Sequence, residues 1–574
     1  MTDFDGVVIG AGHNGLALAA YLSRAGMRVA VLERNDRIGG GSSTEERILP
    51  GYRLNLHANF YMGIGFCPLL RDLELDRYGF SYIEPPVQQA AVFRDGTGIV
   101  IYKDLDKSCA SLARFSRQDA ETFRALWHTY CEEMRPLLVS LLYNAPMPRE
   151  QLIHRLSGSK AKELLSHAQH DLFSVVRKHF VDERIRTLFT SYMHVITTEN
   201  VPGSGIVFPA IFANIASFTL PVGGAVSFAL ALARVVEAGG GEIITNADVK
   251  EIEVANGRAT GVKLSDGRTI DGRKFVASAI DFPTTMQMAG EELFPEPVRE
   301  KAKSWHWGNH SLVTLHLALK NPPAYRAAAF DADVSRAYNI FFGMDHIGDV
   351  ASCFDDCAAK KFPRVLMGNG ACNSIFDPSY APGGKHVAFW WPFAPYSVNG
   401  SPQEWERNRA EYTRRVLDYW RIYAPNLEGD NLIGTYLFTP LDVEKLNANM
   451  RQGAVRVGAY VPGQLGHQPS ASADAGIAHA GGGALSLRFV VGKWRRHQWG
   501  PGLHRRQRDR RRPQAQAVLE AGTGARVDAL MGRDHLSHHP AATTAHVVTM
   551  SSTLAPRDRS LTGLAKPCRK GPIA

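Results

Sequence analysis

The sequence has few cysteines and lacks long apolar runs. Seven cysteines occur in 574 residues and none forms a CxxC pair, which argues against a disulfide framework, a zinc ribbon and a dithiol redox centre. The most apolar region, 211–236, is interrupted by Pro221, Gly223 and Gly224, so no stretch is long enough for a membrane-spanning helix. The first strand-like run begins at Asp5, which leaves no room for a signal peptide. We therefore expect a soluble protein of a reducing compartment, the cytoplasm.

Tyrosine and asparagine are absent from the last part of the chain, and so are most acidic residues. Residues 467–574 contain 17 basic and 6 acidic residues, a net charge of +11, whereas residues 1–466 have a net charge of −2. A basic composition raises the question of a nucleic-acid or membrane partner. That question concerns only this last segment, because the rest of the chain is close to neutral.

Two apolar runs and a glycine-rich turn open the chain. Asp5 to Ile9 predicts a strand buried on both faces, 16–25 predicts a helix of small residues, and 28–32 predicts a second buried strand. The turn between the first strand and the helix, 10–15, reads GAGHNG, a GxGxxG motif, and Glu33 follows the second strand. This βαβ arrangement is typical of a dinucleotide site. The alternative is a purely structural glycine turn with an incidental acid.

Each residue of this motif has a distinct task in a dinucleotide site. Gly10 permits the tight turn, Gly12 lets the backbone approach a pyrophosphate, and Gly15 lets helix and strand pack closely. The free N–H groups at the helix N-terminus face the phosphates, and Glu33 accepts hydrogen bonds from the adenosine ribose.

A second glycine cluster favours FAD over a nicotinamide dinucleotide. The run RIGGGSS, 37–43, follows Glu33 almost directly. Nothing in a nicotinamide-binding domain requires glycines there, whereas the longer FAD molecule extends its ribityl chain and ring past this loop. The alternative for this cluster is an ordinary turn.

The glycine motifs, the apolar periodicity and the distinct last segment together predict an α/β fold with a Rossmann-like FAD-binding domain, an inserted helical cap, a second α+β substrate domain and a disordered C-terminal tail. Strands are expected at 242–245, 249–254, 259–264, 269–277, 311–319 and 386–391, and helices at 225–238 and 403–423. The predicted segments are 1–77 and 206–285 (FAD-binding domain), 78–205 (mostly helical cap), 286–438 (substrate domain), 439–466 (a truncated return to the FAD-binding domain) and 467–574 (tail).

Several motifs resemble those of the FAD-dependent phytoene dehydrogenase-like oxidoreductases. They are GAGHNG, the ERxxRIGG of 33–40, the TEExxxPG of 44–51, the PVGG of 221–224 and the TPLD to NMxxG stretch of 439–453. Within this family the chain looks most like the branch called pyridine nucleotide-disulfide oxidoreductase domain-containing protein 2. The resemblance covers most of residues 1–466 and implies FAD as cofactor, an apolar or conjugated substrate, and Val249 with its backbone against the adenine. The cofactor-binding residues expected from motifs and resemblance together are Gly10, Gly12, His13, Asn14, Gly15, Glu33, Arg34, Arg37, Gly39, Gly40, Gly41, Ser42 and Val249.

The resemblance stops at Gly466, where a closing flavin motif of the form GGxNGAPG is missing. Back-translation of 487–516 with the frame moved by one base yields GGGINGAPG, and the single-codon residues Trp494 and Trp499 both become the glycines that the motif needs. We therefore predict a frame slip between Gly466 and His467, and a largely disordered tail. On this interpretation neither the arginine-rich run 505–512 nor the histidines of 535–539 has a function in nucleic-acid or metal binding.

No nucleophile triad or metal set stands out, and the catalytic residues stay unknown. His57 is a candidate for the flavin edge, although a lone histidine is more often structural. The aromatic segments 60–61, 341–342 and 389–393 are candidates to line an apolar cavity, with ordinary core packing as the more common alternative. The expected partners are a small apolar substrate, no nucleic acid, and a peripheral membrane contact for substrate uptake. The competing hypothesis is a defective protein that binds FAD weakly and does not turn over.

Overall fold

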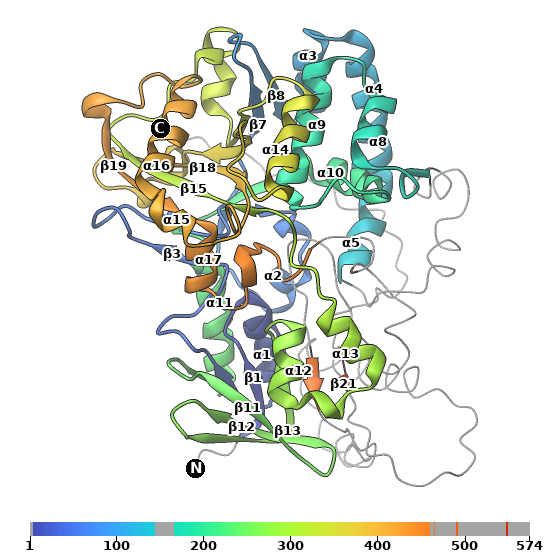
Figure 1. The fold of residues 1–574 in the computed structure, drawn as a ribbon, viewed down its shortest axis with the longest axis vertical. Helices are drawn as coiled ribbons and strands as arrows, with labels where there is room; N and C mark the ends of the chain where they lie inside the picture. The colour runs from blue at the N-terminus through green and yellow to red at the C-terminus, as the bar shows by residue number, and fades with distance from the viewer. Residues whose placement is uncertain are drawn as a thin grey trace, which may run out of the picture.

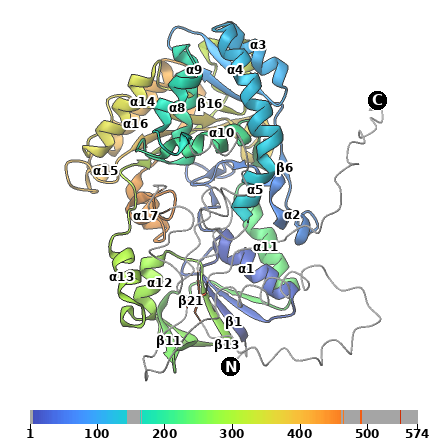
Figure 2. The ribbon, with the colours of Figure 1, turned by 90° about the vertical axis from the view of Figure 1, so that its right-hand side faces the viewer.

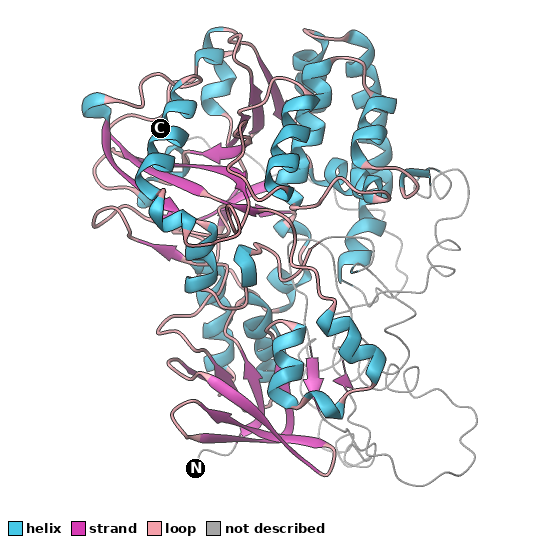
Figure 3. Ribbon diagram, in the orientation of Figure 1, coloured by secondary structure: helices cyan, strands magenta, loops and turns pink. Residues whose placement is uncertain are grey.

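The computed structural model describes residues 4–143, 163, 166–459, 464, 489–491 and 547–548. Two bodies lie along the long axis of the molecule (Figures 1 and 2), one built around β1 and β13, the other around β15 and β18. Both contain helices and strands (Figure 3), so the predicted α/β fold class is confirmed. Within the described part of the chain, no helix has the length and apolar character needed to cross a membrane.

The first sheet contains the predicted βαβ unit. Its strand order is β10-β2-β1-β13-β12-β11, with β10, β2, β1 and β13 parallel and the last three strands joined as antiparallel pairs. Every residue of β1 and β2 is buried, because α1 and α11 pack on one face of this sheet and against each other, while β11, β12, α12 and α13 cover the other face. The elements are β1 (Phe4–Ile9), α1 (His13–Arg24), β2 (Val29–Leu32), α11 (Val226–Ala238), β10 (Glu242–Ile244), β11 (Val249–Ala255), β12 (Arg258–Leu264), β13 (Thr269–Ser278), α12 (Phe282–Ala289) and α13 (Glu296–Lys303).

The second sheet has the order β19-β15-β18-β17-β16-β7-β8, and β14 pairs with β18. Both faces are buried, so neighbouring residues belong to different cores: Phe341 and Trp391 face one, Phe342 and Trp390 the other. The elements are β7 (Val87–Val92), β8 (Gly98–Tyr102), β14 (Ser311–Leu312), β15 (Thr314–Leu319), β16 (Asn339–Phe342), α14 (Ile347–Ala358), β17 (Gly368–Ala371), β18 (His386–Ala394), α15 (Glu404–Arg407), α16 (Arg409–Arg421) and β19 (Leu432–Phe438).

The predicted helix 403–423 is two helices. Asn408 lies between α15 and α16 with φ −101° and ψ 6°, and its side-chain amide donates to the Glu404 carbonyl oxygen at 2.8 Å. An asparagine that bonds to a nearby backbone carbonyl competes with helical hydrogen bonding. The apolar periodicity continues across this break, which is why the sequence pattern predicts a single helix.

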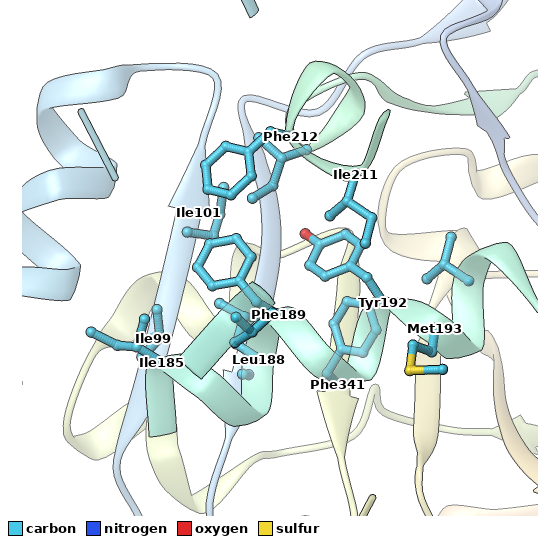
Figure 4. Close-up of a cluster of buried hydrophobic side chains, with 14 of the residues drawn as sticks. Ile99, Ile101, Ile185, Leu188, Phe189, Tyr192, Met193, Ile211, Phe212 and Phe341 are labelled. Atoms are coloured by element: carbon cyan, nitrogen blue, oxygen red, sulfur yellow. The ribbon is translucent and has the colours of Figure 1, made fainter. Parts of the chain in front are cut away.

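The segment 78–205 begins with strands and continues as helices. β7 and β8 lie in it and join the second sheet by the parallel pairing of β7 with β16, an edge that the sequence pattern did not indicate. Its other described elements are β6 (Tyr82–Ile83), α3 (Leu105–Ala113), α4 (Arg117–Trp127), the π-helix η2 (His128–Met134), α5 (Arg135–Tyr143), α8 (Leu172–His179) and α9 (Glu183–Ile196). Figure 4 shows side chains of α9 packed against β8, β16 and α10 (Phe208–Asn214). This shared core joins the helices to the second sheet.

Further short elements lie outside the two large sheets. They are β3 (Thr44–Glu45), β4 (Leu54–Asn55), β5 (Tyr61–Met62), α2 (Pro68–Asp72), β9 (Phe218–Pro221), α17 (Pro440–Leu446) and η10 (Arg451–Gly453), which follows α17. Beyond Gly466 the structure describes only β20 (Phe489–Val491), paired with β13, and β21 (Val547–Val548), paired with β20. The disorder predicted for the rest of 467–574 falls outside the described residues.

Candidate dinucleotide site

A cavity of about 410 Å³ lies where β1, β2 and β13 end and α1 begins. This is the edge at which parallel α/β sheets bind their ligands. Its walls come from both glycine loops, from the start of α12, and from the segment after α17. The lining residues used below are Gly10, Gly12, His13, Asn14, Glu33, Arg34, Gly40, Gly41, Val249, Trp305, Asn447, Asn449, Met450 and Gln464.

The first glycine loop has the conformation that the motif predicts. Gly10 has φ +94°, and its N–H donates to the Leu32 carbonyl at 2.7 Å. A Cβ on Gly15 would lie 2.0 Å from the Gly10 carbonyl oxygen, so helix and strand approach too closely for any other residue. Gly12 differs: a Cβ there would meet only the Gly40 Cα, at 4.0 Å. The space in front of Gly12 is cavity.

The second glycine loop lies directly beside the first. Gly39 donates its N–H to the Ala11 carbonyl at 2.9 Å and forms a parallel bridge with Gly12. Gly40 has φ +55°, and a Cβ on it would lie 3.1 Å from the Gly12 Cα. On Gly41 a Cβ would lie 2.9 Å from the Met450 methyl carbon. The glycines therefore bring two loops and the segment after α17 together along one cavity wall.

Glu33 is buried at the far end of the cavity, with 7% of its surface exposed. Its carboxylate accepts from the Ala11 N–H at 3.1 Å and from the Asn35 N–H at 3.0 Å. Burial raises the pKa of Glu33, against the opposing effect of these hydrogen bonds. Each carboxylate oxygen has lone pairs beyond those used here, so the group can accept further hydrogen bonds from a ligand in the cavity.

The remaining residues predicted to bind the cofactor divide into two groups. His13, Asn14, Arg34 and Val249 line the cavity together with the glycines and Glu33. Gly15, Arg37, Gly39 and Ser42 do not line it.

The residues of the second group support the loops instead. Arg37 pairs with Glu45 at 3.1 Å. The Ser42 hydroxyl accepts from the Tyr61 hydroxyl at 3.1 Å. Gly39 has φ +115°, a conformation that favours glycine.

Two cavity-lining asparagines have unused hydrogen-bonding capacity. The Oδ1 atoms of Asn14 and Asn449 are buried and have no hydrogen-bond partner in the described structure. Buried polar atoms are normally satisfied, so these two atoms indicate a ligand that completes them. The open face of Gly12 and the buried carboxylate of Glu33 fit an adenosine diphosphate group, and the cavity therefore suits a dinucleotide.

The segment after α17 lies in the predicted return to the FAD-binding domain, 439–466, but none of its residues was among those predicted to bind the cofactor. Residues 447–451, 455–459 and Gln464 line the cavity, and Trp305 lines it as well. Thr439 and Asp442 form a capping box at the start of α17, and Arg409 binds Asp442 through two contacts of 2.8 and 2.9 Å. In the sequence, only the NMxxG stretch of 449–453 pointed to this wall, and no motif pointed to Trp305.

The candidates for catalysis lie elsewhere. Neither His57 nor the aromatic residues of 341–342 and 389–393 line this cavity, and those aromatic residues are core residues of the second sheet. His57 contacts Phe438 edge-on with ring centroids 5.2 Å apart, and both its ring nitrogens are buried without a hydrogen-bond partner in the described structure. Burial, assisted by Arg37, lowers the pKa of His57 to about 4, so the imidazole is neutral at physiological pH.

Comparison with known proteins identifies relatives over most of the chain. The family described as flavin containing amine oxidoreductase matches residues 15–418. A limonene dehydrogenase subunit of Castellaniella defragrans is 29% identical over 481 residues, which cover 81% of this chain and 86% of the relative. The mouse pyridine nucleotide-disulfide oxidoreductase domain-containing protein 2 is 26% identical over 488 residues, covering 77% of this chain and 82% of that protein.

A third relative and one solved structure extend the comparison. A 4,4'-diapophytoene desaturase of Methylomonas is 23% identical over 433 residues, covering 72% of this chain and 77% of the relative. The crystal structure of an oxidoreductase from Methanosarcina mazei superposes with a TM-score of 0.54 at 18% identity, covering 84% of this chain and 98% of that one. That similarity shows a shared fold.

Proposed function

The chain belongs to the flavin containing amine oxidoreductase family, and on that premise we propose that it transfers hydride from an apolar, isoprenoid or carotenoid-like substrate to FAD. The family match and the oxidoreductase relatives confirm the predicted phytoene dehydrogenase-like family, the cofactor FAD and the reaction class. When bound, FAD supplies the two-electron acceptor.

The observation that carries the proposal is the pair of adjoining glycine loops on one cavity. In this proposal the Gly12 backbone faces the pyrophosphate at the N-terminus of α1, where free N–H groups favour anions. Glu33 accepts from the ribose, and Val249 lies against the adenine. Gly40, Gly41 and Met450 line the same cavity and would contact the extended part of FAD.

The names of two relatives support the substrate class. One is a limonene dehydrogenase subunit and another is a diapophytoene desaturase, and both names refer to isoprenoid hydrocarbons. Such molecules offer no charged group for recognition and dissolve in bilayers. We therefore include in the proposal a peripheral membrane contact for substrate uptake and no nucleic-acid partner. The six described cysteines are buried free thiols, which supports a cytoplasmic location.

The experiment follows the bound flavin of the purified full-length protein. We expect a yellow protein whose flavin absorbance bleaches when it is mixed anaerobically with limonene or diapophytoene in detergent. Free FAD with the same compounds is the control. A colourless preparation that FAD cannot reconstitute would refute FAD binding by this chain. Bleaching by primary amines and not by either hydrocarbon would overturn the substrate class.

We also propose that residues 467–574 are read out of frame. The support is the recovered GGGINGAPG motif and the two tryptophans that become its glycines. Resequencing the gene across the Gly466 codon tests this directly, and an intact frame overturns it. If the slip is real, the alternative of a defective chain predicts that restoring the frame raises both FAD occupancy and turnover.

A further inference from the structure

Three metal-ligating side chains converge in the helical region, away from the dinucleotide cavity. Glu163 and His167 are four residues apart, the spacing that puts two side chains on one helical face. His179 is the last residue of α8. One nitrogen or oxygen atom from each of the three residues lies within 4.8 Å of the other two. The sequence spacing alone gives no such cluster, because the third member comes from another helix.

The geometry of the two histidines is that of ligands to a common ion. Their Nε2 atoms face each other at 3.3 Å. Two nitrogens bound to one tetrahedral zinc at 2.0–2.1 Å are about 3.3–3.4 Å apart, which matches this distance. In the absence of an ion the same contact is an N–H···N hydrogen bond between the two rings.

The surroundings hold these ligands in place. His167 has 3% of its surface exposed, and the His179 ring stacks on Phe208 with centroids 5.1 Å apart. The Tyr130 hydroxyl donates to the Glu163 carboxylate at 2.6 Å, the kind of outer contact that orients a metal-binding carboxylate.

We propose that Glu163, His167 and His179 form a binding site for a divalent cation of the zinc type, with water as the fourth ligand. Two imidazoles and one carboxylate are ligands that zinc prefers. The ion would join Glu163 and His167 to α8 and, through Tyr130, to η2, so its role is to stabilise the helical region.

The test titrates zinc into the full-length protein after chelation and dialysis, and uses cobalt as a spectroscopic probe of tetrahedral coordination. The variants are His167→Gln and His179→Gln. The matched control is His170→Gln, because His170 is exposed and does not belong to the cluster. The eight histidines of 467–574 can bind zinc too, but they are present in all variants. A difference between variants in the amount of zinc bound therefore reports on the proposed site alone.

We expect wild type and His170→Gln to bind one more equivalent of zinc than either ligand variant, and to gain thermal stability from it. Indistinguishable zinc titrations of wild type and both ligand variants would overturn the site. Should a ligand variant fail to fold, Tyr130→Phe keeps all three ligands. It is expected to weaken zinc binding by about 10- to 100-fold, and an unchanged affinity in that variant counts against the site.

Discussion

The open space in front of Gly12 leads to a prediction that separates binding from folding. Gly12 has φ −70° and ψ 167°, a conformation open to any residue, and a Cβ there touches nothing closer than 4.0 Å. Gly12→Ala gains about 0.4–1 kcal/mol from a less flexible unfolded chain. It loses about 0.5–1 kcal/mol because alanine is a poorer N-cap than glycine. The free energy of unfolding of the apoprotein should therefore stay within about 1 kcal/mol of wild type.

FAD binding should respond very differently. The new methyl group occupies the place of the pyrophosphate and prevents its approach to the backbone N–H groups at the start of α1. Loss of one charge-assisted hydrogen bond costs about 1.5–3 kcal/mol, which weakens FAD binding by about 10- to 150-fold. Titration of FAD into the apoprotein, followed by flavin fluorescence, measures the dissociation constant, and urea unfolding measures stability.

Gly15→Ala is the matched comparison in the same loop. Its Cβ would lie 2.0 Å from the Gly10 carbonyl oxygen, so this variant should lose stability by about 1–3 kcal/mol or more. A Gly12→Ala protein that folds normally and binds FAD with unchanged affinity would refute our position for the pyrophosphate. A large loss of stability in Gly12→Ala would refute the claim that the space is cavity.

Three further predictions concern charge and acidity. Glu33→Gln removes a charged acceptor from the cavity and should raise the FAD dissociation constant about tenfold; equal affinities in a fluorescence titration would argue against a ribose contact. Asp442→Asn breaks the ion pair with Arg409 and should cost about 1–2 kcal/mol in urea unfolding, whereas Asp418→Asn, at a more exposed pair, should cost almost nothing. Burial lowers the pKa of His316 from 6.5 to about 3. As the pH falls, this histidine is therefore protonated in the unfolded chain before it is protonated in the folded chain, and acid favours unfolding. Stability should fall below about pH 6.5 by up to about 1.4 kcal/mol per pH unit for this residue, and His316→Phe should flatten that slope; parallel pH profiles would contradict this.

Local sequence was enough to predict the dinucleotide-binding unit. The strands β1 and β2 are fully buried apolar runs, and Gly10 and Gly15 occupy positions that exclude a Cβ. Each of these requirements concerns residues close together in the chain. The GxGxxG motif and Glu33 therefore predicted both the loop and the end of the cavity.

The aromatic segments show where local sequence was insufficient. Phe341 and Phe342 are adjacent, yet they pack into different cores because the second sheet is covered on both faces. The sequence of an aromatic pair in a strand is the same whether that strand lines a cavity or packs in a core. Only the elements that cover the sheet decide between the two.

The sequence by itself determined the class of ligand, because a βαβ unit with its glycines and acid is a local pattern with one steric solution. Tertiary structure decided the rest of the site. It brought Met450 to Gly41, placed Arg37 and Ser42 in supporting contacts, and set His167 opposite His179. The first contact joins residues about 400 positions apart, and the others depend on how loops and helices fold back on themselves. No periodicity in the sequence records any of them.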